Sequence, residues 1–205
     1  MIRRLILIAL ASASLALPLA VRAADVTEVG GVKYENTTTL GGAKLQLNGA
    51  GVRYKAVFKV YAAGLYLNSK ASTPEAVLAS NGPRRLHIVM LREIDANELG
   101  KLFTKGMEQN ASREEFSKVI PGVIKMSDIF SMRKKLSPGE YFTIDYVPGT
   151  GSIISVMGKP ASDPIKEPEF FNALMKIWLG KSPADAQLKD LLLGKSPSSN
   201  FNNSN

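Results

Sequence analysis

The sequence of 205 residues contains no cysteine and a single histidine, His87. Without cysteine the chain forms neither disulfides nor thiolate metal sites. One imidazole has no second histidine or cysteine with which to hold a metal ion. A lone histidine is also more often a packed or strand-edge residue than a catalyst. The sequence therefore predicts neither a metal site nor a cofactor.

A phosphate-binding loop and a nucleic-acid-binding stripe are also absent from the sequence. Gly180-Lys181-Ser182 and Gly194-Lys195-Ser196 match the end of the phosphate-loop motif. The glycine that the motif requires five positions earlier is replaced by Met175 and by Lys189. The basic residues are scattered along the chain, and Arg133-Lys134-Lys135 is their longest run. We therefore expect no nucleic-acid partner.

The only long apolar run lies near the N-terminus. Arg3-Arg4 precedes an apolar run over residues 5–19, and Val21-Arg22-Ala23 has the small-x-small pattern of a cleavage site. The alternative, a membrane anchor, is disfavoured because the run is short and ends at this site. We expect residues 1–23 to be a cleaved secretory signal, with the mature chain starting near Ala24 and no transmembrane span.

The charge that remains after this signal is moderately positive. The formal net charge of +8 falls to +5, because residues 1–23 hold three arginines and no acidic residue. A positive field of this kind favours anionic ligands or an anionic membrane surface. An exported chain that has no disulfides suits a bacterial periplasm, where packing must supply the stability. We therefore expect a periplasmic protein.

The remaining chain has the length of one domain, which we place at residues 24–194. The Ser- and Asn-rich tail over 195–205 is expected to be disordered. Alternation and turn residues predict strands, and helical spacing with capping residues predicts helices. The predicted strands are a hairpin over 26–34 and segments 52–57, 59–67, 85–91, 141–147 and 152–159. The predicted helices are 73–79, one capped by Asp95, 112–120, 123–132 after a break at Pro121-Gly122, an amphipathic one from Pro168 to Gly180, and 182–193.

This order of elements predicts an α+β fold. Strands come first, followed by a block of helices, a hairpin and terminal helices, which is typical of an antiparallel sheet with helices packed on one face. A ligand could lie between the sheet and the helices, where apolar walls meet a few polar groups. The oligomeric state does not follow from these patterns.

One helical face after Asp95 carries apolar residues and a glycine at helical spacing. They are Leu99, Leu102, Phe103, Gly106 and Met107. Such a face forms either ordinary core or the apolar wall of a ligand cavity.

Two polar residues lie on neighbouring predicted strands. Arg53 offers a planar fork of donors, and Tyr61 adds a phenolic hydroxyl. The pair could form a clasp for one carboxylate group. The alternative is a surface arginine beside a tyrosine at the edge of the core.

Four segments, taken in order, resemble the chalcone isomerase family and its fatty-acid-binding relatives. The first is residues 51–67, in which Arg53 precedes a Lys-Val-Tyr-Ala-Ala-Gly strand. The others are residues 85–91, the Pro-Gly-Thr-Gly turn over 148–151, and residues 170–180 with a closing glycine. The resemblance covers most of the chain after the signal. It implies an open-faced β-sandwich with a large antiparallel sheet.

The resemblance also implies which catalytic groups are kept. Plant chalcone isomerases close a flavanone ring with an arginine, a strand threonine, a helix tyrosine and asparagine, and a late hydroxyl. These positions correspond here to Arg53, Tyr61, Leu99 and Gly106, with Ser162 the nearest candidate for the late hydroxyl. The arginine is retained, and the polar helix residues are replaced by apolar or small ones. A site without those groups has lost much of what orients a substrate.

The fatty-acid-binding branch is the more similar one, because it pairs the arginine with a tyrosine. We interpret the chain as a protein that binds a small amphipathic anion such as a fatty acid, without catalysis. The ligand-binding residues would be Arg53 and Tyr61 together with the apolar helix face. Two alternatives remain: an intramolecular lyase or isomerase acting on a phenolic enone, with Arg53 stabilising the oxyanion, and a periplasmic partner protein with a vestigial pocket.

Overall fold

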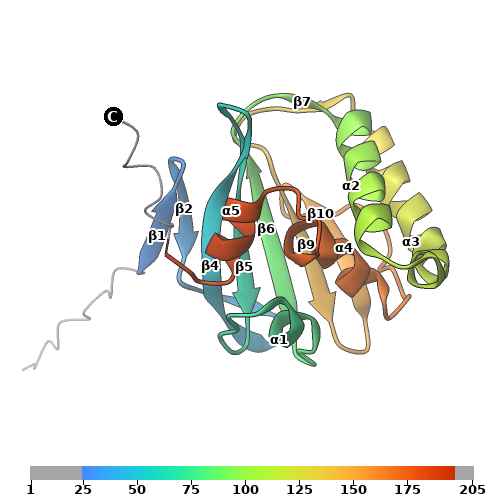
Figure 1. Ribbon diagram of the computed structural model, residues 1–205, viewed down its shortest axis with the longest axis horizontal. Helices are drawn as coiled ribbons and strands as arrows, with labels where there is room; N and C mark the ends of the chain where they lie inside the picture. The colour runs from blue at the N-terminus through green and yellow to red at the C-terminus, as the bar shows by residue number, and fades with distance from the viewer. Residues whose placement is uncertain (1–24, 197–205) are drawn as a thin grey trace, which may run out of the picture.

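The computed structural model describes residues 25–196. The predicted signal over 1–23 and nearly all of the predicted tail lie outside the described residues. The fold is built on a seven-stranded antiparallel sheet with the strand order β11-β10-β9-β6-β5-β4-β3 (Figure 1). Its strands are β3 (Thr37–Leu40), β4 (Ala43–Lys55), β5 (Phe58–Leu67), β6 (Arg84–Met90), β9 (Tyr141–Val147), β10 (Gly151–Val156) and β11 (Lys159–Pro160).

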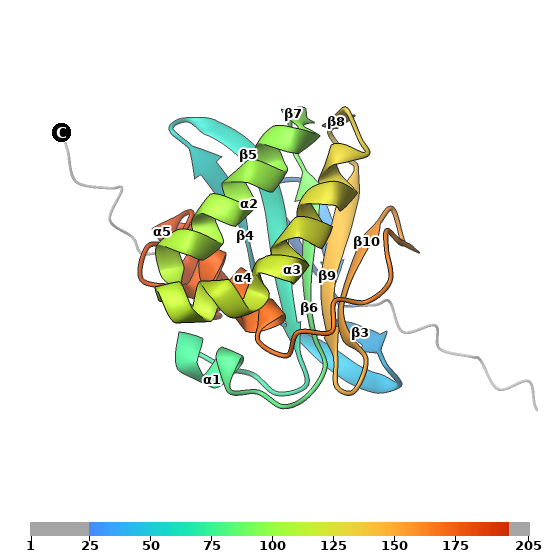
Figure 2. The ribbon, with the colours of Figure 1, turned by 90° about the vertical axis from the view of Figure 1, so that its right-hand side faces the viewer.

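The longer helices cover one face of this sheet, as Figures 1 and 2 show. The helices are α1 (Pro74–Leu78), α2 (Ala96–Asn110), α3 (Arg113–Ser131), α4 (Phe170–Leu179) and α5 (Ala186–Leu192). Two short strands, β7 (Ile94–Asp95) and β8 (Lys135–Leu136), pair at the start of α2. The predicted α+β class, with a large antiparallel sheet and helices on one face, is confirmed.

Alternation along the central strand β6 shows why this face is buried. Leu86, Ile88 and Met90 are buried among the helix-side core residues, whereas the residues between them are only partly buried. Successive side chains of a strand point to opposite faces, so an apolar residue at every second position forms one continuous core surface. The strand predicted over 85–91 is therefore present, with its apolar residues on the helix-covered face.

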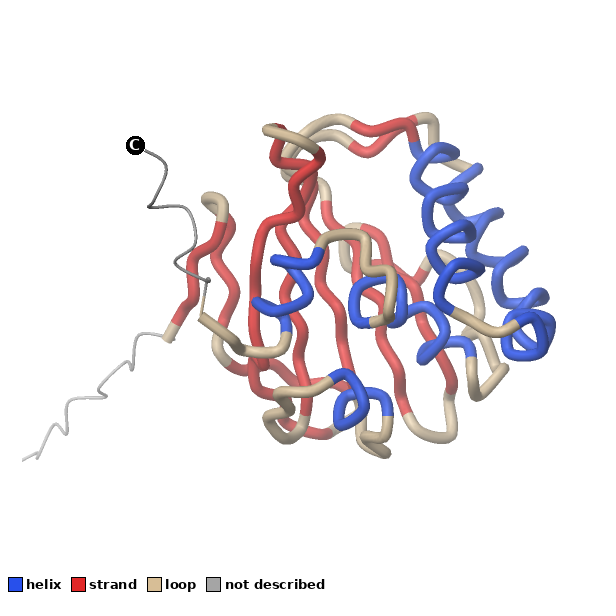
Figure 3. The backbone as a smooth tube through the Cα atoms, in the orientation of Figure 1, coloured by secondary structure: helices blue, strands red, loops and turns tan. Residues whose placement is uncertain are grey.

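A small hairpin packs on the opposite face of the sheet. It consists of β1 (Val26–Val29) and β2 (Val32–Glu35), and it appears beside the main sheet in Figure 3. Its Tyr34 is buried in a second apolar cluster with residues such as Leu45 and Tyr66. Gly64 makes room for this tyrosine, because a Cβ at that position would lie 2.7 Å from the Tyr34 ring. The predicted hairpin in this region is present.

Helix α4 is buried on nearly all sides. Only Asn172 and Lys176 of its ten residues are not fully buried. It contacts α2 and α3 as well as α5, so partners surround it. The sequence predicted an amphipathic helix with one exposed face, whereas α4 is enclosed by other elements. A helix in that position needs apolar residues around most of its circumference.

Boundaries are wrong in one strand and two helices. The strand predicted over 52–57 is the end of the longer β4, which begins at Ala43. Helix α3 runs through Pro121 without the predicted break. Proline removes one backbone donor, but the next residue packs closely on α4 and on Ile165: a Cβ at Gly122 would lie 2.5 Å from the Phe170 ring. Tertiary packing therefore holds the helix together across the proline.

The last helix begins later than predicted. It starts at Ala186, and the side chain of Asp185 accepts a hydrogen bond from the backbone N–H of Leu188. The backbone N–H of Ser182 instead donates to the Asn110 side chain, and that of Ala184 donates to the Ile177 carbonyl. These contacts hold residues 182–184 as a loop against α2 and α4.

Candidate functional site

Arg53 and Tyr61 face each other across the β4–β5 pair. They are direct register partners, and the register shifts just after Arg53. Residues directly opposite each other in an antiparallel pair point to the same face, which here is the helix-covered face. The Arg53 Cζ lies 5.5 Å from the centre of the Tyr61 ring. The sheet therefore brings the two predicted polar residues together.

The Tyr61 phenol is buried and neutral. Its side chain is 1% exposed, and its hydroxyl oxygen accepts a 2.8 Å hydrogen bond from the Trp178 Nε1–H. Burial, with a smaller contribution from nearby Asp185, raises the pKa of Tyr61 to about 12 against the opposing effects of Arg53 and of the Trp178 hydrogen bond. The phenol therefore keeps its proton at neutral pH and remains a hydrogen-bond donor.

Arg53 is half-buried, and its charge has no ion-pair partner within residues 25–196. Its Nε is buried and makes no hydrogen bond with the described residues. The nearby carboxylate of Asp185 accepts backbone hydrogen bonds of 2.9 Å from Tyr54 and 3.0 Å from Leu188. The guanidinium is therefore available to an anion from outside the chain.

A cavity of about 310 Å³ adjoins this pair. Arg53 and Tyr61 form its polar wall. Its apolar wall comes from α2 and α4, with a loop and two longer polar side chains completing it. The residues beyond the polar pair are Leu99, Leu102, Phe103, Lys105, Gly106, Gln109, Ile177, Ser182, Pro183 and Ala184.

Six of the seven predicted ligand-binding residues line this one cavity. The seventh, Met107, is fully buried in the core and does not line it, because it points away from the space that its helical neighbours border. Gly106 contributes by lacking a side chain, since a Cβ there would lie 3.2 Å from Ile177. That these residues bind a ligand stays a prediction.

Several lining residues were missed by sequence reasoning. Ile177 and the loop over 182–184 come from a distant part of the chain. Trp178 does not line the cavity but donates the hydrogen bond that holds the Tyr61 hydroxyl. The helical spacing of Ile177 and Trp178 marked an apolar face, but spacing does not separate core from cavity wall. Ser162, the candidate for the late hydroxyl, does not line the cavity and donates to the carbonyl of Asp163 instead.

His87 lies on the other face of the sheet. Its ring packs between those of Tyr34 and Tyr141, with centroid separations of 5.5 and 5.1 Å. Burial, together with the charge of Arg85, lowers its pKa to about 4. It borders a separate cavity of about 410 Å³. The histidine is therefore a neutral packed residue and takes no part in the Arg53 site.

The described part of the chain offers no cluster of three histidine, cysteine or acidic side chains that could hold a metal ion. None of its helices is both long and apolar enough to cross a membrane.

Comparison with known proteins identifies relatives in family and in fold. Residues 26–194 match the profile of a family described as chalcone isomerase-like. The crystal structure of a fatty-acid binding protein from Arabidopsis thaliana has a similar fold, with a TM-score of 0.62 and 13% identity. That similarity covers 80% of this chain and 93% of the plant chain. No curated protein matches the sequence.

Proposed function

This chain belongs to the chalcone isomerase-like family, and we propose that it binds a medium-chain fatty acid or a similar small amphipathic anion without catalysing a reaction. One observation carries the proposal. Arg53 and Tyr61 line the same cavity as apolar residues of α2 and α4. A cation and a neutral phenol at one end of an apolar space match the chemistry of a carboxylate attached to a hydrocarbon chain.

The head group would be held by the clasp. The guanidinium of Arg53 presents a planar fork that suits both oxygens of a carboxylate. The Tyr61 hydroxyl accepts from Trp178, which leaves its own hydrogen to donate to the ligand. A hydrogen bond to a charged group contributes about 1.5–3 kcal/mol. The arginine is therefore the larger contributor of the two.

The hydrocarbon chain would lie against Leu99, Phe103 and Ile177, which line the cavity. Burial of each CH₂ contributes about 0.8 kcal/mol. The cavity of about 310 Å³ lies at the lower end of the roughly 300–1,000 Å³ usual for ligand pockets. This size favours a medium-chain ligand over a long one. The name of the plant neighbour, a fatty-acid binding protein, supports the same ligand class.

The alternative functions fit the site less well. Leu99 and Gly106 line the cavity at the positions where the resemblance implies a catalytic tyrosine and asparagine, and neither residue has a side chain that can form a hydrogen bond. We expect chalcone cyclisation at close to its uncatalysed rate, and turnover of about 1 s⁻¹ would support an enzyme instead. A vestigial pocket would leave Arg53 exposed with no cavity beside it, whereas the arginine is half-buried and borders one.

Calorimetric titration with decanoate tests the proposal. We expect the wild type to bind and Arg53→Ala to bind ten- to a hundredfold more weakly, through loss of the charged hydrogen bond. Arg113→Ala is the matched control, because Arg113 is an exposed arginine that does not line the cavity. Equal affinity for the wild type and a folded Arg53→Ala variant would contradict the clasp.

We also propose that the chain is exported to the periplasm. The basic start, the apolar run and the cleavage pattern at Val21-Arg22-Ala23 support it. N-terminal sequencing of the protein from a periplasmic fraction should begin at Ala24 or within one residue of it. An intact Met1 in that fraction would contradict cleavage.

A further inference from the structure

The turn between β4 and β5 exposes apolar side chains to solvent. Six consecutive residues, 54–59, are exposed. Among them Val57 is 82% exposed, Phe58 59% and Tyr54 39%. Single exposed apolar residues are ordinary on protein surfaces, but this turn gathers three within five positions. The β4–β5 turn rises at one end of the molecule in Figures 1 and 3.

The backbone explains why these side chains lack cover. Ala56 has a φ of +53°, the left-handed conformation that closes a tight turn. Phe58 is 59% exposed, and the Arg92 guanidinium lies 5.3 Å from the centre of its ring. The residues at the turn therefore project beyond the sheet and bury little surface within the chain.

The charged side chains within the turn itself are of one sign. Lys55 and Lys59 flank the apolar pair, and Arg92 lies against it. Acidic side chains near the turn are bonded within the chain. Asp185 accepts from the Tyr54 backbone N–H, Glu93 binds Lys135 at 2.6 Å, and Asp95 caps α2 through the Glu98 backbone N–H. Within residues 53–59 there are three cations and no acid. An anionic partner is therefore favoured at this turn.

We propose that the β4–β5 turn, residues 54–59, docks on a bilayer containing anionic phospholipid, with Val57 and Phe58 inserted among the lipid chains. Aromatic and apolar residues partition into the bilayer interface, and flanking lysines are attracted to anionic head groups. A second copy of the chain fits less well, since a stable protein interface covers roughly 800 Å² per partner and the apolar part of this turn has only three side chains.

The position of the turn connects it with the candidate site. Arg53 and Lys55 line a cavity of about 170 Å³, and Arg53 and Leu102 also line the 310 Å³ cavity. Docking of the turn would thus place the arginine end of the site near the lipid head groups. The docking proposal goes beyond the proposed function, and it does not require the cavity to hold a fatty acid.

Vesicle sedimentation tests the proposal with the purified full chain. We expect the wild type to sediment with vesicles of phosphatidylglycerol and phosphatidylcholine, and not with phosphatidylcholine alone. The bound fraction should fall as salt is raised, because salt screens the lysines. Phe58→Asp should weaken binding to the anionic vesicles by about tenfold or more. Ile124→Asp is the matched control, since Ile124 is 57% exposed on α3.

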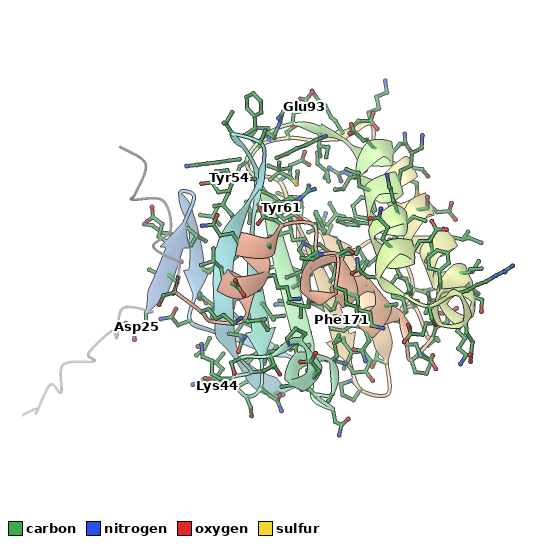
Figure 4. The ribbon with its side chains drawn as sticks, viewed as in Figure 1. Asp25, Lys44, Tyr54, Tyr61, Glu93 and Phe171 are labelled. Atoms are coloured by element: carbon green, nitrogen blue, oxygen red, sulfur yellow. The ribbon has the colours of Figure 1, made fainter. Side chains whose placement is uncertain are left out.

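A charge-matched pair tests the lysines separately. Lys55→Glu should weaken vesicle binding by about tenfold. Lys44→Glu makes the same change in net charge at the opposite end of the molecule and should have little effect; Figure 4 labels Lys44 there, away from Tyr54 and Glu93. Equal losses in the two variants would show a general charge effect and contradict docking through the turn.

A fluorescent reporter locates the contact. Phe58→Trp adds an exposed indole to a chain whose only tryptophan is buried. Its emission should shift to the blue when anionic vesicles are added. An unchanged emission spectrum would overturn the proposal. So would a Phe58→Asp variant that binds vesicles as well as the wild type, or a concentration-dependent dimer that Phe58→Asp abolishes.

Decanoate binding in the absence of vesicles should be the same in Phe58→Asp as in the wild type. This measurement distinguishes failure of the fatty-acid proposal from failure of the docking proposal.

Discussion

The indole Nε1–H of Trp178, on α4, donates a 2.8 Å hydrogen bond to the hydroxyl oxygen of Tyr61, on β5. Both side chains are at most 1% exposed, so this bond joins helix α4 to strand β5 without competition from water. It also sets the direction of the phenol at the cavity wall. Trp178 therefore positions one half of the proposed clasp although it does not line the cavity.

A double-mutant cycle should show that this hydrogen bond couples the two residues. Tyr61→Phe leaves the buried indole N–H without a partner, which costs about 1–3 kcal/mol of unfolding free energy. Trp178→Phe should then cost less in the Tyr61→Phe background than in the wild type. Urea unfolding of the four proteins measures the difference. Additive costs would mean that the bond contributes nothing to stability.

The two polar residues should contribute unequally to ligand binding. Tyr61→Phe should weaken decanoate binding less than Arg53→Ala does, because it removes one neutral donor and no charge. Arg53→Lys should restore only part of the affinity, since an ammonium group does not make the paired planar contact. Calorimetric dissociation constants check the order. Full affinity in Arg53→Lys would indicate that charge alone holds the ligand.

Two glycines in α2 should respond differently to alanine. A Cβ at Gly100 would make an ordinary 3.5 Å contact with Phe130, whereas one at Gly106 would lie 3.2 Å from Ile177. Gly100→Ala should raise the free energy of unfolding by about 0.5–1 kcal/mol through helix propensity. Gly106→Ala should gain less, because Ile177 must move. Equal gains in urea unfolding would show that Ile177 yields freely.

His87 should make the fold sensitive to mild acid. Its pKa is lowered from an ordinary 6.5 to about 4 by burial and by Arg85. The unfolded chain therefore binds the proton more tightly, and the stability that neutral His87 contributes above about pH 6.5 is lost as the pH falls through 4. A difference of this size between the pKa values of the folded and unfolded chain corresponds to about 3 kcal/mol of unfolding free energy at most.

His87→Gln isolates that contribution from the carboxylates that also titrate in acid. The variant should lose less unfolding free energy than the wild type between pH 6.5 and pH 4 in parallel urea titrations. Because the comparison is between slopes, a different starting stability of the variant does not affect it. Parallel curves would place the acid sensitivity elsewhere in the fold.

Local patterns predicted most of the elements correctly. Asp95 caps α2 as expected, and α3 begins after Ser112, whose side chain forms a reciprocal capping box with Glu115. These signals are reliable because a cap satisfies backbone donors within one turn of itself. The break predicted at Pro121 failed for the opposite reason: α4, some fifty residues away, supplies the packing that carries the helix through.

The sequence by itself determined the class of the fold, the apolar face of α2, and the likeness of the Arg53–Tyr61 segment to one family. These properties depend on residues close together in the chain, where periodicity and capping act. Only the tertiary structure decided that Leu99 and Gly106 border a cavity while Met107 does not. It also decided that Trp178 supports Tyr61. The physical reason is that core residues and cavity-wall residues have the same apolar spacing along a helix. Only the packing of α2 and α4 over the sheet leaves space beside Leu99 and Gly106 and fills the space around Met107.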